Sequence, residues 1–230
     1  MSLRAVLFDA GNTLLFLDYA RLAPAVAEAT GTPLTAEGLE AQAGPAAQVL
    51  EQAGTSDRAR ATAYLEALFT LAGIPAEKLG IVRDVLYRLH QERHLWSGQH
   101  PGTRDGLERL RSAGWRLGVV SNSDGRAEEA LAASGLRDFF ELVVDSQLVG
   151  FEKPDPRIFE AALARMGLEA AQTLYVGDIY EVDVVGARRA GMPVVLLDPR
   201  GERPGLDVAV VHSIAQLADQ LLSAPQGVLR

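Results

Sequence analysis

The chain has 230 residues, 48% of them hydrophobic and 23% charged, which predicts a globular protein with room for one α/β domain and a smaller second domain. A net charge of −8 argues against nucleic acid or an anionic membrane as a partner, and the lack of cysteine excludes disulfides, thiolate metal sites and cysteine catalysis. No apolar run approaches the roughly 18 residues that a membrane span needs. The first strand starts too close to residue 1 for a signal peptide, so we expect a cytoplasmic protein.

The first predicted element is a short apolar strand that ends at Phe8, and Asp9 follows it directly. A carboxylate in this place can attack phosphorus or carbon and form a covalent intermediate. It can equally cap a turn or a helix, which is the commoner role for a lone Asp. The choice between these interpretations depends on what lies at the ends of the later strands.

The next segment, residues 17–96, contains no comparable strand and is rich in Ala, Leu and Glu. Its glycines and prolines separate four expected helices, of which the second can break at Gly44-Pro45. The helices expected are Tyr19–Thr30, Thr35–Ala53, Asp57–Ala72 and Ala76–His94. Four helices inserted after one strand predict a separate bundle, joined to the rest near residues 16–18 and 95–102.

Three side chains of this insert could take part in chemistry, but each has a simpler interpretation. Lys78 falls between two of the helices and is predicted to lie on the surface. His90 and His94 are four residues apart, a spacing that can bind zinc, but Gln91 stands where zinc proteases need Glu. We therefore predict two exposed histidines at a helix end.

From Pro101 onward the sequence alternates between helix, glycine and strand. The strands are short, β-branched and apolar on both faces, which is typical of parallel strands buried between helix layers. The expected strands are Trp115–Val120, Phe140–Val144, Thr173–Val176, Pro193–Leu197 and Val208–Val211, and the expected helices are Arg104–Ala113, Glu128–Ser134, Pro156–Met166, Val182–Ala190 and Ser213–Leu222. This alternation predicts a doubly wound parallel sheet, with residues 1–16 and 97–230 as an α/β core and residues 17–96 as an inserted helical bundle.

Polar residues follow several of these strands. Ser121-Asn122 ends one strand, and Gly177-Asp178 ends another, with Asp183 five residues further on. Between them, Lys153-Pro154 is predicted to open a helix in a chain that has only two lysines. Ligands of such sheets bind at the carboxyl ends of the strands, where Asp9, Ser121 and Asp178 all fall.

The order and spacing of Asp9, Ser121, Lys153, Asp178 and Asp183 resemble the haloacid dehalogenase superfamily, most of whose members are phosphatases. The resemblance implies a Rossmann-like core, a helical cap over the active site and a small phosphate ester as substrate. It implies that Asp9 attacks phosphorus to form an aspartyl-phosphate and that Ser121 binds a phosphoryl oxygen. Lys153 would balance the negative charge.

The same resemblance implies a cofactor, Mg²⁺, which prefers hard oxygen ligands. Asp9, the carbonyl of Gly11 and Asp178 would hold the ion, and Asp183 would support it from behind these ligands. Asn122 matches the hydroxyl motif, and Arg21 lies near a joint of the insert, so both are candidates for substrate binding. The alternative for Asp183 is a helix cap, and for Ser121 and Asn122 a polar turn.

Gly11 departs from the pattern, because phosphatases of this superfamily usually carry a second Asp at that position. A glycine keeps the backbone carbonyl but loses the acid that protonates the leaving group, and general acid catalysis contributes about 10²–10⁴-fold. Dehalogenases of the superfamily also lack this Asp, but they lack the metal-binding Asp as well, which is present here as Asp178. We therefore predict a Mg²⁺-dependent phosphatase. The alternatives are a 2-haloacid dehalogenase and a binding or regulatory protein with weakened turnover; a phosphonoacetaldehyde hydrolase would need a cap lysine, for which Lys78 is a poor candidate.

Overall fold

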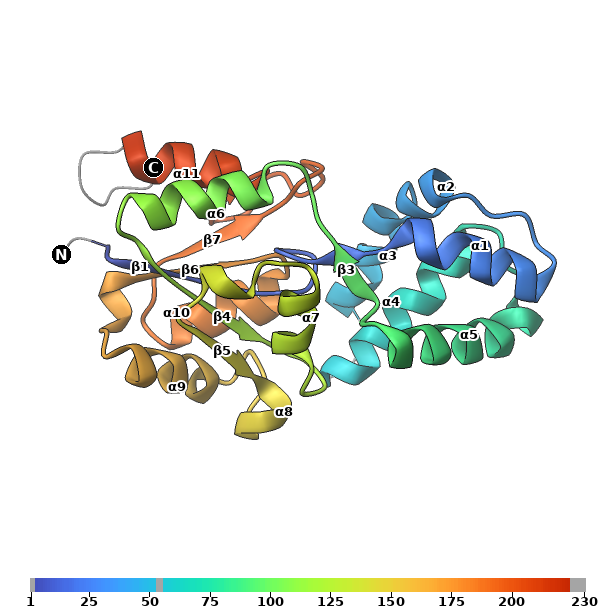
Figure 1. The fold of residues 1–230 in the computed structure, drawn as a ribbon, viewed down its shortest axis with the longest axis horizontal. Helices are drawn as coiled ribbons and strands as arrows, with labels where there is room; N and C mark the ends of the chain where they lie inside the picture. Colours follow the sequence, from blue (N-terminus) through green and yellow to red (C-terminus); the bar gives the residue numbers. More distant parts are fainter. Residues whose placement is uncertain (1–2, 53–55, 224–230) are drawn as a thin grey trace. The chain divides into compact units, whose positions relative to one another are not determined.

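The computed structural model describes residues 3–52 and 56–223, which form two compact units (Figure 1). One unit comprises Met1–Phe16 and Gln99–Arg230, and we call it the core unit. The other, Leu17–Gly98, is the helical unit. The chain thus passes between the units after residues 16 and 98, where the sequence placed the boundaries after residues 16 and 96.

A six-stranded parallel sheet forms the centre of the core unit. Its strands, in spatial order, are β5 (Leu142–Asp145), β4 (Arg116–Ser121), β1 (Ala5–Phe8), β6 (Thr173–Gly177), β7 (Val194–Leu197) and β8 (Ala209–Val211). On one side of β1 the strands follow in the order β4, β5, and on the other side in the order β6, β7, β8, so the direction of strand addition reverses at β1. This confirms the predicted doubly wound α/β fold, with strand bounds within two residues of those expected from the apolar runs.

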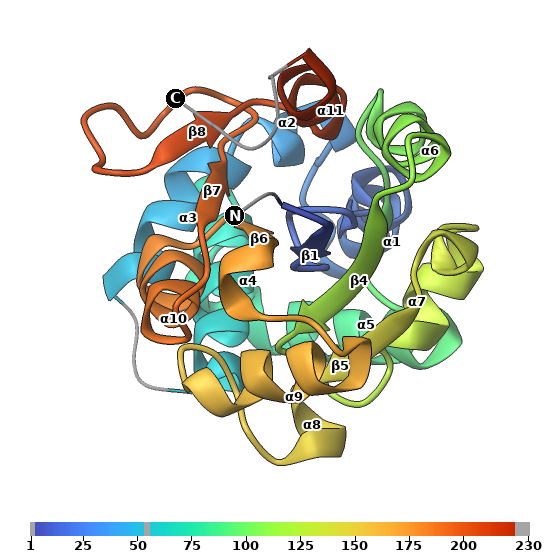
Figure 2. The same ribbon diagram turned by 90° about the vertical axis from the view of Figure 1, so that its left-hand side faces the viewer.

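Helices cover both faces of this sheet (Figures 1 and 2). One face carries α6 (Thr103–Ser112) and α11 (Ile214–Ser223), which pack together, and α7 (Ala127–Ala133). The other carries α9 (Pro156–Met166) and α10 (Val185–Arg189). A Cβ on Gly106 of α6 would lie 2.6 Å from the backbone of Ile214, so glycine permits the close packing of α6 on α11. Both faces of the strands are therefore buried, which explains their continuous apolar sequences.

Short elements complete the core unit. They are α8 (Ser146–Val149), the 3₁₀ turns η2 (Arg137–Phe139) and η3 (Ala170–Gln172), and the π-helix η4 (Tyr180–Val184). The sequence predicted one helix over Val182–Ala190, whereas the structure has the π-helix followed by α10. Lys153 also does not open a helix, because α9 begins at Pro156 and Asp155 caps it by accepting a bond from Arg157 N at 3.0 Å.

The helical unit contains the expected helices in shorter pieces. These are α1 (Tyr19–Thr30), α2 (Ala36–Glu40), α3 (Ala43–Gln52), α4 (Asp57–Leu71), the 3₁₀ turn η1 (Ala76–Lys78) and α5 (Leu79–Glu92). The expected second helix breaks at residues 41–42 rather than at Gly44-Pro45, because proline is tolerated in a first turn, where its missing N–H is not needed. Its expected last residue, Ala53, lies outside the described residues. At the joints, β2 (Phe16–Leu17) pairs with β3 (Trp96–Gly98) in a ribbon that the sequence did not predict.

The chemically notable side chains of the helical unit differ from their predicted surface roles. Lys78 is half-buried and donates to the carbonyl of Thr30 at 2.7 Å and to Thr32 Oγ1 at 3.2 Å, so it caps the end of α1. His90 and His94 are half-buried rather than exposed, with ring centroids 4.7 Å apart, and His94 lies beyond the end of α5. No helix in the described part of the chain is long and apolar enough to cross a bilayer.

Candidate functional site

The register of the sheet brings three of the predicted site residues to one edge. Phe8 of β1 lies opposite Val119 of β4 and Val176 of β6. The residues that follow these three, Asp9, Val120 and Gly177, therefore lie at one level, with Ser121 and Asp178 one residue beyond. This edge is beside β1, where the strand order reverses and where ligands of doubly wound sheets bind.

Asp9 is fixed by its own backbone and by the tight turn that follows it. Its N–H donates to the carbonyl of Val176 at 2.8 Å, and the residue is only 6% exposed. The carbonyl of Ala10 accepts bonds from Leu14 N at 2.9 Å and Leu15 N at 2.8 Å, which closes the turn. Asn12 within this turn has a φ of 53°, unlike any other non-glycine residue in the described part of the chain. These bonds fix the backbone that carries the Asp9 side chain at the carboxyl end of β1.

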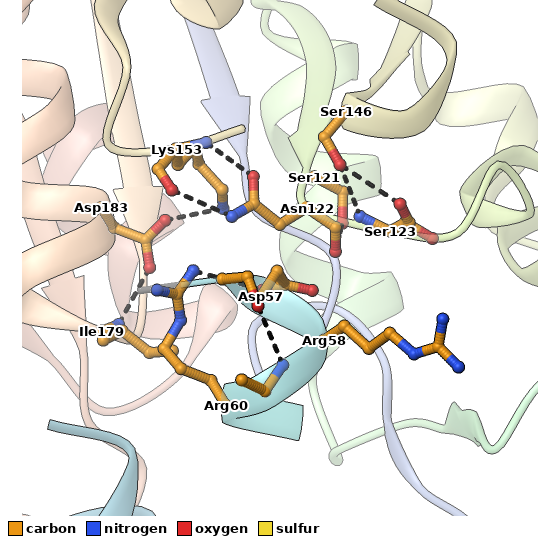
Figure 3. Close-up of polar contacts among 12 residues, drawn as sticks. Asp57, Arg58, Arg60, Ser121, Asn122, Ser123, Ser146, Lys153, Ile179 and Asp183 are labelled. Carbon is orange, nitrogen blue, oxygen red and sulfur yellow. Dashed lines mark hydrogen bonds and ion pairs between the residues drawn. The ribbon is translucent and has the colours of Figure 1, made fainter. Parts of the chain in front are cut away.

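Lys153 is buried between the carboxylates of Asp9 and Asp183, of which Figure 3 shows that of Asp183. Its Nζ lies 2.5 Å from Asp9 Oδ1, 2.7 Å from Asp183 Oδ1 and 3.0 Å from the hydroxyl of Tyr175. Burial alone would lower the pKa of Lys153, but the charges of Asp183 and Asp9 raise that pKa well above its ordinary value. Lys153 is therefore a permanent cation beside Asp9.

Asn122 holds the backbone of Lys153 in place. Its Oδ1 accepts from Lys153 N at 2.7 Å, and its Nδ2 donates to Lys153 O at 3.1 Å (Figure 3). The side-chain amide is thus engaged with the main chain of Lys153. The prediction that Asn122 binds substrate gains no support from these contacts, which give the residue a role in positioning the lysine.

Asp183 organises the loop that carries Asp178. Its Oδ2 accepts from Asp178 N at 3.1 Å and from Ile179 N at 2.9 Å. A Cβ on Gly177 would lie 2.3 Å from Asp183 Cγ, so only glycine allows the carboxylate to come so close. Asp183 lies in the π-helix η4, and such helices are often found at functional sites.

Asp9, Asp178 and Asp183 together form a buried acidic cluster. One carboxylate oxygen from each lies within 4.8 Å of the others. Burial raises the pKa of Asp9 from 3.8 to about 7. The positive charge of Lys153 lowers this pKa, and the negative charge of Asp183 raises it. Burial and the charges of Asp183 and Asp9 also raise the pKa of Asp178 well above its ordinary value. Lys153 offsets only part of this negative charge, and hard oxygen donors with excess negative charge fit a divalent cation such as Mg²⁺.

Ser121 is 2% exposed, and its hydroxyl makes a long contact of 3.4 Å with the carbonyl of Asn122. The loop that follows it is clamped by the end of β5, which sequence reasoning missed. Asp145 accepts from Gly125 N and Ala127 N, both at 3.1 Å, and Ser146 exchanges bonds with the backbone of Ser123. The signal was present in the sequence, because Asp145 directly follows the expected apolar strand Phe140–Val144, as Asp9 follows the first strand.

Two other residues near the acidic cluster were also missed. The hydroxyl of Tyr175 contacts Lys153, and the side chain of Arg203 donates to the carbonyl of Asp178. Tyr175 lies inside an apolar strand, and nothing in its sequence context distinguishes it from a core residue. Arg203 comes from the segment between β7 and β8, where no motif marks it.

Arg21, the other residue predicted to bind substrate, belongs to the helical unit and serves its backbone. Its guanidinium donates to the carbonyls of Leu89 at 2.5 Å and Arg93 at 2.8 Å, where α5 ends. Asp18 accepts from Arg21 N at 3.2 Å and pairs with Arg93 at 2.5 Å. These contacts make Arg21 a helix cap rather than a free cation, and they give its predicted substrate role no support.

The chain is similar to known hydrolases over most of its length. A family model described as haloacid dehalogenase-like hydrolase matches residues 3–191. A glyceraldehyde 3-phosphate phosphatase of Methanothermobacter thermautotrophicus is 42% identical over an alignment of 130 residues that covers 53% of this chain and 58% of that protein. The match thus spans little more than half the length of this relative.

Other comparisons extend over nearly the whole chain. A phosphatase of Mycobacterium tuberculosis is 30% identical over 221 residues, covering 95% of this chain and 98% of that protein. The solved structure of a phosphatase from Thermococcus onnurineus superposes with a TM-score of 0.61 at 25% identity, covering 96% of this chain and 98% of the other. Dehalogenases are also among the solved structures that share this fold.

Proposed function

We propose that this chain, which belongs to the haloacid dehalogenase-like hydrolase family, is a Mg²⁺-dependent phosphatase acting on a small phosphorylated metabolite. The observation that carries the proposal is the acidic cluster. Asp178 adds a second carboxylate beside Asp9, and Lys153 leaves part of the negative charge unbalanced. This surplus suits a bound cation better than it suits attack on carbon by Asp9 alone.

In this reaction Asp9, Lys153 and Ser121 of the core unit would each have a distinct role. The carboxylate of Asp9 attacks phosphorus in line, and the bond from phosphorus to the leaving oxygen breaks to give an aspartyl-phosphate. Water then attacks the phosphorus, which releases phosphate and restores Asp9. Lys153 remains charged throughout and stabilises the negative charge, while Ser121 lies one residue beyond the level of Asp9 and would bind a phosphoryl oxygen.

Asp9, Asp178 and the carbonyl of Gly11 would hold Mg²⁺, with Asp183 orienting the loop of Asp178 through its two backbone bonds. The bound ion would supply positive charge to neutralise the phosphoryl oxygens. No side-chain acid is present at Gly11, so the leaving oxygen must take its proton from water or depart without one. The proposed substrates are therefore those with good leaving groups.

The test is release of inorganic phosphate from a panel of phosphate esters, with Mg²⁺ and after treatment with EDTA. We expect activity that depends on the metal and is lost in Asp9→Asn. Gly11 favours a second candidate, a 2-haloacid dehalogenase, so chloride release from 2-haloacids is measured in parallel. Chloride release at full rate in EDTA, without phosphatase activity, would establish that candidate instead.

A further inference from the structure

Tyr175 is a buried polar residue that the proposed reaction does not use. It lies on β6, has no exposed surface and belongs to the apolar cluster on the α9 side of the sheet. Its ring packs edge-to-face on Phe159, with centroids 4.9 Å apart and planes at 81°. Buried tyrosines usually place their hydroxyl against a partner, and here the partners are groups of the candidate site.

The hydroxyl of Tyr175 meets three of these groups. It lies 3.0 Å from Lys153 Nζ, 3.1 Å from Asp183 Oδ1 and 3.1 Å from the carbonyl of Val120. Val120 directly precedes Ser121, so this one oxygen connects the lysine, the acidic loop and the end of β4. Burial raises the pKa of the Tyr175 phenol well above its ordinary value, which keeps the hydroxyl protonated.

The directions of these bonds follow from the chemistry of the groups. An ammonium has three N–H donors and no acceptor, so Lys153 donates to Tyr175 as well as to Asp9 and Asp183. The phenol accepts that bond and donates its own O–H in a hydrogen bond to Val120 O or to Asp183 Oδ1. All three donors of Lys153 are therefore occupied, and the ammonium cannot rotate without breaking a bond.

We propose that Tyr175 is a positioning residue, which holds the ammonium of Lys153 in line with Asp9 during turnover. Phosphorylation of Asp9 moves its negative charge onto the phosphoryl oxygens, so the ion pair of Lys153 with Asp9 weakens while its ion pair with Asp183 remains. The third bond, from a ring fixed in the core, keeps the ammonium in place. The kinetic consequence of this inference rests on the proposed phosphatase function, whereas the bond itself does not.

The sequence makes this bond measurable without any assay of activity. Lys78 and Lys153 are the only lysines, so protein labelled with ¹⁵N at lysine gives two ammonium signals in NMR, which Lys78→Arg assigns. In Tyr175→Phe we expect the Lys153 signal to shift and its protons to exchange faster with water, while the Lys78 signal stays in place. An unchanged Lys153 signal in the folded variant would overturn the proposal.

Thr173→Val is the matched control. Thr173 lies on the same strand and the same face as Tyr175, is also fully buried, and donates its hydroxyl to a backbone carbonyl, that of Glu169, at 3.2 Å. We expect this variant to leave both lysine signals unchanged. If Tyr175→Phe does not fold, the exchange of ammonium protons with water is compared between the two lysines of the wild type. Exchange at Lys153 as fast as at Lys78 would contradict the bond to Tyr175.

The kinetic arm uses 4-nitrophenyl phosphate with Mg²⁺. Loss of a donor aimed at developing charge costs about 10²–10³-fold in kcat, and loss of its positioning should cost less, so we expect about a tenfold fall for Tyr175→Phe with KM unchanged. A rise in KM with kcat intact would overturn the positioning role. If the wild type hydrolyses no phosphate ester, the proposed function fails while the NMR arm still tests Tyr175.

Discussion

The two lysines of this chain show how differently its two units use charge. Lys153 in the core unit is buried and donates to Asp9, Asp183 and Tyr175, whereas Lys78 in the helical unit donates to a backbone carbonyl and a threonine hydroxyl at a helix end. Arg21 does for α5 what Lys78 does for α1. Around Lys153 charged side chains face one another, which can support chemistry, whereas Lys78 and Arg21 stabilise helix ends.

Because the buried charges meet at the carboxyl ends of the strands, removal of a single charge there should have the largest effect on the rate of phosphate release. Asp9→Asn keeps the size of the side chain but removes the nucleophile, so we expect a fall in the rate of phosphate release on the order of 10⁴-fold or more. Circular dichroism should show an intact fold. Asp84→Asn, an exposed carboxylate of α5, is the matched change in the helical unit and should retain full activity. Substantial turnover by a folded Asp9→Asn protein would remove Asp9 as the nucleophile.

Metal binding should likewise depend on the core unit. Removal of a ligand should cost at least as much as removal of a supporting partner, so we expect Asp178→Ala to weaken Mg²⁺ binding by about 100-fold or more. Isothermal titration calorimetry measures this directly. Asp138→Ala, at an exposed aspartate of η2, serves as the control in the same unit. Equal affinities in the wild type and Asp178→Ala would place the metal elsewhere.

The buried carboxylates also make stability depend on pH. The pKa of Asp9 is raised from 3.8 to about 7 without metal, so the folded protein binds more protons than the unfolded chain between these values. The free energy of unfolding should therefore fall as pH rises from 4 to 7. Mg²⁺ favours the carboxylates and should reverse the loss, with a larger rise in Tm at pH 8 than at pH 5. Equal rises at both values would argue against a metal at Asp9.

Gly11 offers a gain-of-function test at the same edge. The positive φ of this turn belongs to Asn12 and not to Gly11, so an Asp can take the place of Gly11 without backbone strain. Gly11→Asp should restore a general acid and raise the rate on alkyl phosphates by about tenfold, with little change for aryl phosphates. Rates plotted against leaving-group pKa measure the effect. A flat plot for the wild type would mean that another acid already protonates the leaving group.

The smallest effect is expected when the lysine of the helical unit is changed. Lys78→Met keeps the apolar stem but removes the cap of α1, which should lower the free energy of unfolding by about 1 kcal/mol in a urea titration. Its kcat should remain that of the wild type. Lys153→Met, the same change in the core unit, should instead abolish turnover. Loss of kcat in both variants would refute the contrast between the units.

The sequence by itself determined the sheet and the level at which its polar residues meet. Apolar runs of four to six residues set each strand, and the parallel register then brought Asp9, Ser121 and Asp178 to one edge. Glycines after helices and the Ala-rich insert fixed the remaining order of elements. Such features are local, because they depend on residue type and spacing, and so they can be predicted from one chain.

Tertiary structure decided which atoms these side chains touch. Asn122 and Arg21 carry the polar groups that a substrate would need, but folding directs them to the backbone of Lys153 and to the end of α5. Tyr175 has the sequence context of a core residue, yet its hydroxyl reaches the lysine because β6 and the turn before α9 are adjacent only in the fold. A hydrogen bond depends on positions within a fraction of an ångström, which residues far apart in sequence acquire only when the chain has packed.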